Sequence, residues 1–435
     1  MKQKPRDEAG HFLGLVPLLF FLVVYISSGV VFNNFDAMPL LVAMILATIL
    51  ALALNPHERL NEKLAVFYKG AGQDTMILMI VIFMLAGAFY YVTKSMHAVD
   101  TVTMLGLRFL PKNFIIPGVF VLGCLISFAM GTSMGTVAAL MPIAAQIGQM
   151  AHISLPLLAG VVVSGAMFGD DLSLISASAI ISAQTQSVSI FAKFKTNAIM
   201  VLPAFILTTL LLAFVPVGTF SLGMYKAVQW LNLLPYVLVI VLSFMNLNVL
   251  IVLTLGIISA VLIGLFHGDF TFIQSLSLIH KGILSMADVS FISIIVGGLA
   301  ALMEHMGGIQ WLLQRITKHA HSSIGGKFAI AFLILLLDVI TTNNTVSVMI
   351  AGPIAKKLGH NYHISPSYTA SILDIYSCVG QGLIPYGAQL LMASSLVGIS
   401  AASIVPYSWY CMLLFVISSL FLLSPYSPKE NQLRI

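Results

Sequence analysis

The sequence contains little charge. Asp, Glu, Lys and Arg make up 8% of the 435 residues, whereas 59% of the residues are hydrophobic. Soluble domains carry about 25% charged residues, so this composition excludes a soluble globular domain and predicts a polytopic membrane protein. The net charge of +5 is then explained by lysines and arginines on the cytoplasmic face of a membrane. We expect the lipid bilayer, and no nucleic acid, as a partner.

Cysteine is also scarce. Cys124, Cys378 and Cys411 all lie in apolar runs without the spacing of metal ligands. We expect buried free thiols and neither a disulfide nor a zinc site. Because no zinc motif and no pair of nucleophile and base is visible, the sequence does not predict an enzyme or a resident cofactor.

Apolar runs able to cross, or nearly cross, a bilayer about 30 Å thick fill the chain. They lie at roughly 12–32, 38–54, 74–93, 114–148, 155–182, 197–218, 233–244, 248–266, 288–303, 328–356, 366–399 and 406–424. Small polar residues split 114–148 and 328–356, which predicts re-entrant hairpins with deep tips. We predict broken helices near the midplane for 155–182 and 366–399. The expected interruptions are Gly165, Gly169 and two aspartates in the first, and Gly380, Gly382 and Pro385 in the second.

The two hairpin runs correspond to each other. Pro142 and Pro353, and likewise His152 and His363, are 211 positions apart. Matching features at one fixed offset indicate an internal repeat. The loop after the first hairpin lacks lysine and arginine, whereas its counterpart contains two adjacent lysines, at 356 and 357. Equivalent loops with opposite charge bias predict that the two halves have inverted topology.

The sequence therefore predicts an all-α polytopic membrane protein built as an inverted repeat. Each half is expected to contain five transmembrane helices and one re-entrant hairpin, with broken helices at the midplane. The first repeat is expected over residues 1–218 and the second over 219–435. We expect a multi-pass protein of the bacterial inner membrane with both termini in the cytoplasm and, because the first apolar run is long enough to span, without a cleaved signal.

Oxygen-bearing side chains gather at the four interruptions of the apolar runs. A hard cation such as Na⁺ takes carboxylate, hydroxyl, amide and carbonyl oxygens as ligands. The predicted ion or substrate site consists of Thr132, Ser133 and Thr136; Asp170, Asp171, Ser173 and Ser176; Asp338, Asn343, Asn344 and Thr345; and Asp374 and Gln381. For Asp338 the alternative is a structural cap of the second hairpin tip.

The acidic residues of this set are Asp170, Asp171 and Asp374, which we predict to be the Na⁺ ligands. Ionisable residues inside a membrane are by default functional. Burial and like-charge repulsion favour protonation of one of the adjacent aspartates, and a bound cation would expel that proton. Such competition suffices for Na⁺/H⁺ exchange and leaves open which aspartate exchanges the proton. A helix cap at Asp170 would still be a buried charge.

Two stretches resemble the signatures of NhaC-type Na⁺/H⁺ antiporters. They are GTSMGTVAALMPIA and SGAMFGDDLSLISAS, which are similar to the G-T-S-x-G-T and I-F-G-D-x-x-S-P-x-S-D-T segments of that family, and LIPYGAQLLMAS is similar to its L-I-P-W-N segment. The resemblance covers most of the chain in order. It implies a secondary transporter of the wider ion-transporter fold group, with paired hairpins and a homodimer formed through a scaffold domain. The implied functional residues are Thr132, Ser133, Asp170, Ser173, Ser176 and Asp374.

The sequence departs from this pattern at three positions. Leu174 replaces a proline, Ala177 replaces an aspartate, and Gly387 lies near the family's asparagine. Asp171 is a candidate to compensate for the acid that is missing at Ala177. The family also includes members that exchange organic acids or amino acids, so the resemblance does not fix the cargo.

The function we expect is Na⁺/H⁺ antiport by alternating access, with Na⁺ and H⁺ competing for buried aspartates. The alternative is a Na⁺- or H⁺-coupled transporter or exchanger of a small organic acid or amino acid, because hydroxyl- and amide-rich tips could also hold a carboxylate. A channel is disfavoured because paired inverted halves suit alternating access better than a fixed pore.

Overall fold

The computed structural model describes residues 10–32, 37–56, 58–109, 111–217, 229–245, 247–317 and 322–424. Throughout these residues the regular structure is helical and contains no strand. Up to residue 217 the helices are η1 (Phe12–Leu15), α1 (Val16–Val31), α2 (Leu40–Ala53), α3 (Leu60–Ala71), α4 (Asp74–Ser95), α5 (Ala98–Phe109), η2 (Lys112–Phe114), α6 (Ile115–Met130), α7 (Ser133–Ala151), α8 (Leu155–Leu172), α9 (Ala177–Gln186) and α10 (Ile190–Ala213).

The second half of the chain continues in the same way. Its helices are η3 (Trp230–Leu233), α11 (Leu234–Phe244), α12 (Val249–His267), α13 (Phe272–Ser285), α14 (Ala287–His305), α15 (Gly308–Thr317), α16 (Ser323–Thr341), α17 (Asn344–Asn361), α18 (Pro366–Leu383), α19 (Ala388–Val397), α20 (Ala401–Ile404), η4 (Val405–Tyr407) and α21 (Trp409–Leu423).

The predicted all-α polytopic membrane fold is confirmed. Within the described ranges, nine helices are long and apolar enough to cross a membrane, and ten if the bent pair Pro366–Val397 and Ala401–Tyr407 counts as one span. Helices α10 and α12 leave large apolar side chains exposed along one side, including Leu210 and Leu262. Lipid is the environment that such a surface requires.

Helix bounds recur along the chain at the offset seen in the sequence. Helices α8 and α18 begin and end 211 positions apart, and so do α9 and α19. The left-handed backbone conformation also recurs at this offset. His152 and His363 both have φ 53°. The predicted boundary between repeats, at residues 218 and 219, lies outside the described residues, so the division of the chain stays a prediction.

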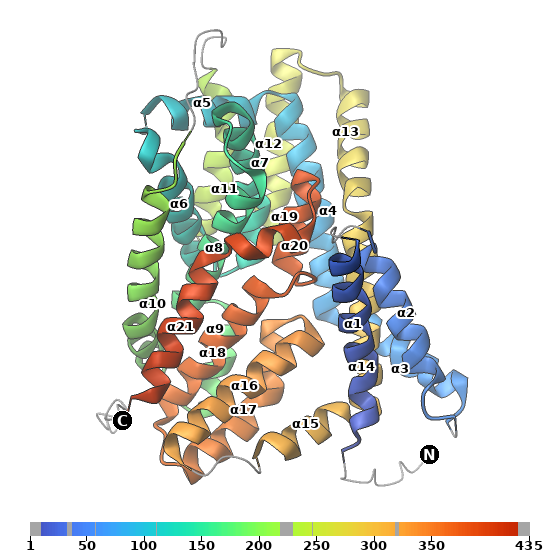
Figure 1. Cartoon of the computed structure of the whole chain (residues 1–435). Coiled ribbons are helices and arrows are strands. Elements are labelled where there is room, and N and C mark those ends of the chain that lie inside the picture. Colours follow the sequence, from blue (N-terminus) through green and yellow to red (C-terminus); the bar gives the residue numbers. More distant parts are fainter. Residues whose placement is uncertain are drawn as a thin grey trace.

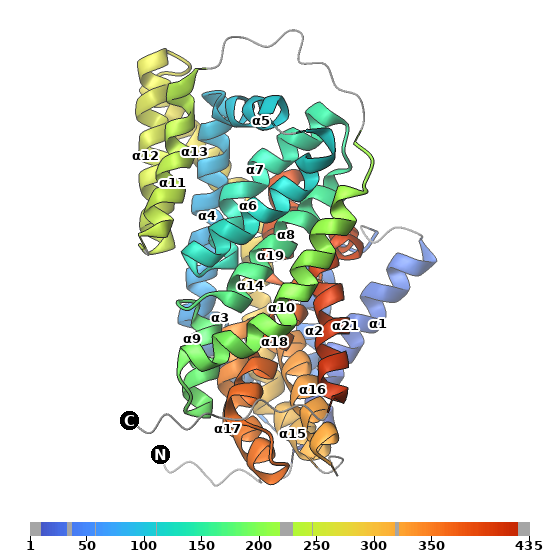
Figure 2. The same ribbon diagram turned by 90° about the vertical axis from the view of Figure 1, so that its left-hand side faces the viewer.

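Two helical hairpins approach the centre of the molecule from opposite ends. The α6–α7 pair lies in the upper half and the α16–α17 pair in the lower half of both views (Figures 1 and 2). Helices α8 and α18 lie between them and contact each other, and each packs against both helices of the neighbouring hairpin. From Leu157 to Leu172, and from Ser367 to Gly382, every residue is buried, so these two helices lie within the core.

The predicted helix interruption in the first half was wrong in position. Helix α8 continues through Gly165 and Gly169 and includes both aspartates in its last turn. The glycines serve packing, because a Cβ atom at Gly165 would lie 2.7 Å from the carbonyl oxygen of Phe120 in α6. A glycine costs a helix about 1 kcal/mol relative to alanine, and close helix packing offsets that cost. In α18, likewise, Gly380 and Gly382 are helical and the break begins at Ile384.

Short helices connect several of the longer ones, and the apolar runs in the sequence did not predict them. Helices α3, α5, α13 and α15 have 10 to 14 residues and a polar face. Apolar length alone does not reveal amphipathic helices of this kind. Helix α10 also begins before the predicted run 197–218, so Lys193 lies inside this helix.

Candidate functional site

The two hairpin tips share one backbone geometry. In the first tip Gly131 is left-handed, with φ 61°, and the next residue, Thr132, is extended and immediately precedes α7. In the second tip Thr342 is left-handed, with φ 51°, and Asn343 is extended and caps α17. Positive φ is unusual for a β-branched residue such as threonine, so the second tip carries strain. Strained backbone clusters at functional sites.

The helix breaks lie just beyond the central helices. Helix α8 ends at Leu172, and α9 starts after Ser176, whose hydroxyl accepts a hydrogen bond from the backbone N–H of Ala179 over 3.3 Å. Helix α18 ends at Leu383 and α19 starts after Gly387. The end of a helix leaves carbonyl oxygens without partners in the helix. Here the carbonyl oxygen of Asp170 accepts a hydrogen bond from the Ser176 hydroxyl over 3.2 Å.

Both tips and both breaks line a single cavity of about 580 Å³. The predicted site residues in its wall are Thr132, Ser133, Asp170, Ser176, Asn343, Asn344, Thr345 and Gln381. Sequence reasoning missed four further polar residues of the wall, Thr75, Ser178, Asn248 and Gln389. The structure therefore brings residues from all four predicted interruptions into one polar chamber.

Asp170 is the acidic residue among the described residues that line the cavity. Its carboxylate faces the hydroxyl and the backbone N–H of Ser133 in the first turn of α7. The Ser133 hydroxyl accepts a hydrogen bond from Gln389 Nε2 over 3.0 Å, which leaves its own hydrogen free to point at the carboxylate. A helix amino terminus favours negative charge, so this end of α7 favours the ionised form of Asp170 although no positive side chain is among the described residues that line the wall.

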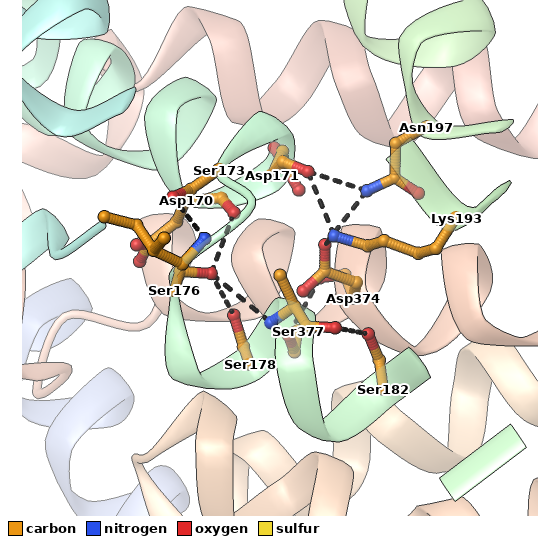
Figure 3. Close-up of polar contacts among 12 residues, drawn as sticks. Asp170, Asp171, Ser173, Ser176, Ser178, Ser182, Lys193, Asn197, Asp374 and Ser377 are labelled. Carbon is orange, nitrogen blue, oxygen red and sulfur yellow. Dashed lines mark hydrogen bonds and ion pairs between the residues drawn. The ribbon is translucent and has the colours of Figure 1, made fainter. Parts of the chain in front are cut away.

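Asp171 and Asp374 lie behind the cavity wall in a fully buried cluster (Figure 3). Asp374 Oδ2 forms an ion pair with the ammonium of Lys193 in α10 and accepts a hydrogen bond from Asn197 Nδ2 over 2.9 Å. Asp171 Oδ2 accepts a hydrogen bond from the Tyr410 hydroxyl over 2.7 Å. In the described part of the chain, no three His, Cys, Asp or Glu side chains gather as metal ligands. The three-aspartate Na⁺ ligand set therefore stays a prediction, with only Asp170 facing the cavity.

Asp338 is buried at the inner end of α16. Its Oδ1 accepts hydrogen bonds from Ser347 Oγ over 3.2 Å and from Gln381 Nε2 over 3.0 Å. Gln381 itself lines the cavity. Asp338 therefore connects the second hairpin to the second broken helix, and Gln381 separates it from the chamber. Asp338 also has the structural contacts expected of a tip cap.

Two predicted site residues have structural contacts away from the cavity wall. Thr136 Oγ1 donates to the carbonyl oxygen of Thr132 one turn earlier, over 3.1 Å. Ser173 Oγ accepts a hydrogen bond from the backbone N–H of Ile175 over 3.2 Å. Both side chains satisfy backbone groups near an interruption, as serine and threonine commonly do.

Lys193, Asn197 and Tyr410 are the members of the buried cluster that sequence reasoning missed. Lys193 and Asn197 are four residues apart, so they lie on one face of α10. That spacing was a usable signal, but a lysine next to an apolar run is more commonly a flank at the membrane surface. Tyr410 lies in an apolar run with nothing nearby in the sequence to single it out.

A polytopic helical fold with a central polar chamber is the architecture of a secondary transporter. The model of the Na⁺/H⁺ antiporter family matches residues 11–217 and again residues 194–424, and the chain belongs to that family. The resemblance to NhaC-type proteins is thereby confirmed.

Individual relatives align along nearly the whole chain. The malate-2H⁺/Na⁺-lactate antiporter of Bacillus subtilis is 24% identical over 450 residues, covering 95% of this chain and 94% of the relative. The Na⁺/H⁺ antiporter NhaC of the same organism is 24% identical over 441 residues, covering 92% and 95%. Among solved structures, the YdaH transporter of Alcanivorax borkumensis is 14% identical, with 95% and 98% coverage and a TM-score of 0.43.

Proposed function

We propose that this protein is a Na⁺/H⁺ antiporter in which Na⁺ and H⁺ compete for the carboxylate of Asp170. The observation that carries the proposal is the position of this carboxylate on the wall of a chamber that both hairpins and both broken helices share. Hydroxyl and amide oxygens of Ser176, Asn344 and Gln381 in the same wall are of the kind that coordinates Na⁺.

Competition at one carboxylate links the two ions. A protonated Asp170 is neutral and gives up the charge that attracts a cation, whereas bound Na⁺ keeps the carboxylate ionised and expels the proton. If the chamber opens alternately to the two sides of the membrane, each Na⁺ that moves one way requires a proton to occupy the site on the return. Hairpins that enter from opposite ends (Figure 1) suit such alternating access.

The proposal includes the setting of the protein. We place it in the cell membrane of a bacterium, with both chain termini in the cytoplasm and with a second copy as its partner in a homodimer. The orientation follows from the bias of lysine and arginine toward one set of loops. In this orientation the α16–α17 hairpin enters from the cytoplasmic side.

A second candidate function is coupled exchange of a small organic acid or amino acid. The observation that favours it is the size of the chamber, about 580 Å³, which lies within the range of about 300–1,000 Å³ typical of small-molecule sites. Side-chain amides of Asn343, Asn344 and Gln389 could donate hydrogen bonds to a carboxylate. The relative named as a malate and lactate antiporter is consistent with this alternative.

Transport by purified protein in liposomes separates the two candidates. The liposomes contain a pH-sensitive dye, and Na⁺, malate, lactate or an amino acid is added outside. Proton movement driven by Na⁺ alone is the result expected of the antiporter. Proton or radiolabelled Na⁺ movement that requires an organic anion or amino acid would replace it with the second candidate.

A further inference from the structure

Lys193 places an ammonium group in the core of a membrane protein. Its side chain is 1% exposed, and Nζ forms an ion pair with Asp374 Oδ2. Nζ also donates a hydrogen bond to the main-chain carbonyl oxygen of Asp171 over 3.2 Å. Burying an ammonium costs free energy unless negative and polar groups surround it. The groups around Lys193 therefore indicate whether this position is suited to a cation.

Oxygen atoms dominate the surroundings of this ammonium. Asn197 Nδ2 donates to the same two oxygens that Lys193 contacts, the carbonyl oxygen of Asp171 over 2.8 Å and Asp374 Oδ2 over 2.9 Å (Figure 3). Three side-chain oxygens of these residues, Asp171 Oδ1, Asp374 Oδ1 and Asn197 Oδ1, are buried and have no hydrogen-bond partner among the described residues. The ammonium of Lys193 thus contacts a carboxylate oxygen and a main-chain carbonyl oxygen, and both kinds of oxygen bind hard cations.

The backbone adds negative potential at the same point. The carbonyl oxygen of Asp171 belongs to the last turn of α8, which ends at Leu172. Carbonyl groups at a helix carboxyl terminus carry partial negative charge and favour a cation. The ammonium of Lys193 therefore lies against the carboxylate of Asp374 and against a main-chain carbonyl oxygen at a helix end.

We propose that Lys193 is a tethered cation that occupies a second cation position, between Asp171 and Asp374. The covalent ammonium stays with the protein and takes the place of a Na⁺ ion there, so that free Na⁺ binds only at the Asp170 position in the chamber. Lys193 thus sets the number of ions that the protein binds. This role deepens the proposed function, on which it rests for the Na⁺ site at Asp170.

Removal of the ammonium converts its position into a metal site. Lys193→Met keeps an unbranched apolar side chain and removes the charge, so the oxygens that contacted the ammonium become available to Na⁺. Equilibrium binding of radiolabelled Na⁺ to the purified protein in detergent, at an alkaline pH that keeps carboxylates ionised, counts the ions. We expect Lys193→Met to bind about one Na⁺ more per chain than the wild type, because an unpaired carboxylate with neutral oxygen donors binds hard cations.

Three further variants give this count its controls. Lys193→Arg keeps a charge at the position and is expected to bind as many Na⁺ ions as the wild type. Lys327→Met removes another fully buried lysine, in α16, and is expected to leave the count unchanged. The double variant Lys193→Met with Asp374→Asn removes both charges of the ion pair and is expected to return the count to the wild-type value.

The outcomes distinguish this inference from the antiporter proposal. If folded Lys193→Met binds no more Na⁺ than the wild type, the tethered-cation role is overturned. If Lys193→Met folds only in Na⁺, the role is supported, because a ligand stabilises the state that binds it. If it fails to fold at any Na⁺ concentration while the double variant folds, Na⁺ cannot replace the ammonium and the inference fails. A wild type without bound Na⁺ would count against the antiporter alone, since a gained site in Lys193→Met would still support the tethered cation.

Discussion

Gly169 of α8 lies directly against Ser127 of α6. A Cβ atom built on the glycine would be 2.2 Å from the Ser127 Cβ atom and 2.4 Å from the backbone nitrogen of Phe128. The Ser127 hydroxyl crosses the same interface and donates to the carbonyl oxygen of Ala166 over 2.6 Å. This contact fixes the first hairpin to the helix that carries Asp170, so the position of the carboxylate in the chamber depends on it.

Gly169→Ala is predicted to destabilise the protein and to weaken transport. The added methyl group meets backbone on α6 that cannot move aside independently, and overpacking of this kind costs about 1–3 kcal/mol. Gly72→Ala is the matched control, because a Cβ atom there would lie no closer than 3.3 Å to its nearest neighbour, the carbonyl oxygen of Tyr68. Thermal unfolding in detergent measures the difference. Equal melting temperatures for the two variants would contradict the packing role.

The hairpins and the chamber could be predicted from the sequence because their signals are local. Small polar residues interrupt long apolar runs, and Gly131 marks the first tip as a left-handed position. The second tip has Thr342 at the equivalent place, so no glycine marks the turn there, and the signals were the small polar residues and the repeat. The signal at Gly169 was misread, because a glycine that interrupts a helix and one that allows close packing look alike in a sequence.

The buried ion pair could not be predicted from the sequence. Lys193 and Asp374 are far apart in the chain, and their pairing depends on how α10 packs on α18. For the same reason the sequence could group Asp170 with Asp171 but could not tell that neighbours on a helix face different surroundings. Adjacent helical residues point in directions about 100° apart, which sends one carboxylate into the chamber and the other behind its wall.

Asp338 is predicted to matter first for stability. Replacement by alanine leaves the donors on Ser347 and Gln381 without an acceptor, and an unsatisfied buried group costs about 1–3 kcal/mol. Asp338→Asn has a side chain of similar size and keeps an acceptor oxygen, so this variant should lose less stability than Asp338→Ala. Denaturation of both variants measures which one loses more free energy of unfolding. If Asp338→Asn destabilised the protein as much as Asp338→Ala, the charge rather than the hydrogen bonds would be essential.

The inverted arrangement makes a prediction about accessibility. His152 lies in the turn between α7 and α8, whereas Lys356 lies exposed on α17, in the opposite half of the molecule (Figure 2). A single cysteine at each position should react with a membrane-impermeant thiol reagent from opposite sides of the membrane. The native cysteines are buried, which keeps the background low. Labelling of both positions from one side would exclude inverted halves.

The pH dependence of transport follows from competition at Asp170. If protons and Na⁺ bind the same carboxylate, lowering the pH on the side where Na⁺ binds reduces the fraction of sites open to Na⁺. The apparent KM for Na⁺ is predicted to rise as pH falls, by up to about tenfold per pH unit where the carboxyl group is mostly protonated. The maximal rate at saturating Na⁺ should change less. Initial rates across a matrix of pH and Na⁺ concentration test this, and a KM independent of pH would rule out competition.

The central claim is that the carboxylate of Asp170 is the shared position of Na⁺ and H⁺. Its most direct test is Na⁺-driven proton movement in proteoliposomes that contain the wild type, Asp170→Asn or the control Asp74→Asn, which changes an exposed aspartate at the start of α4. Asp170→Asn should fold and give no more proton movement than protein-free liposomes, because an amide cannot exchange a proton for a cation. Asp74→Asn should transport like the wild type. Wild-type proton movement in folded Asp170→Asn would contradict the account.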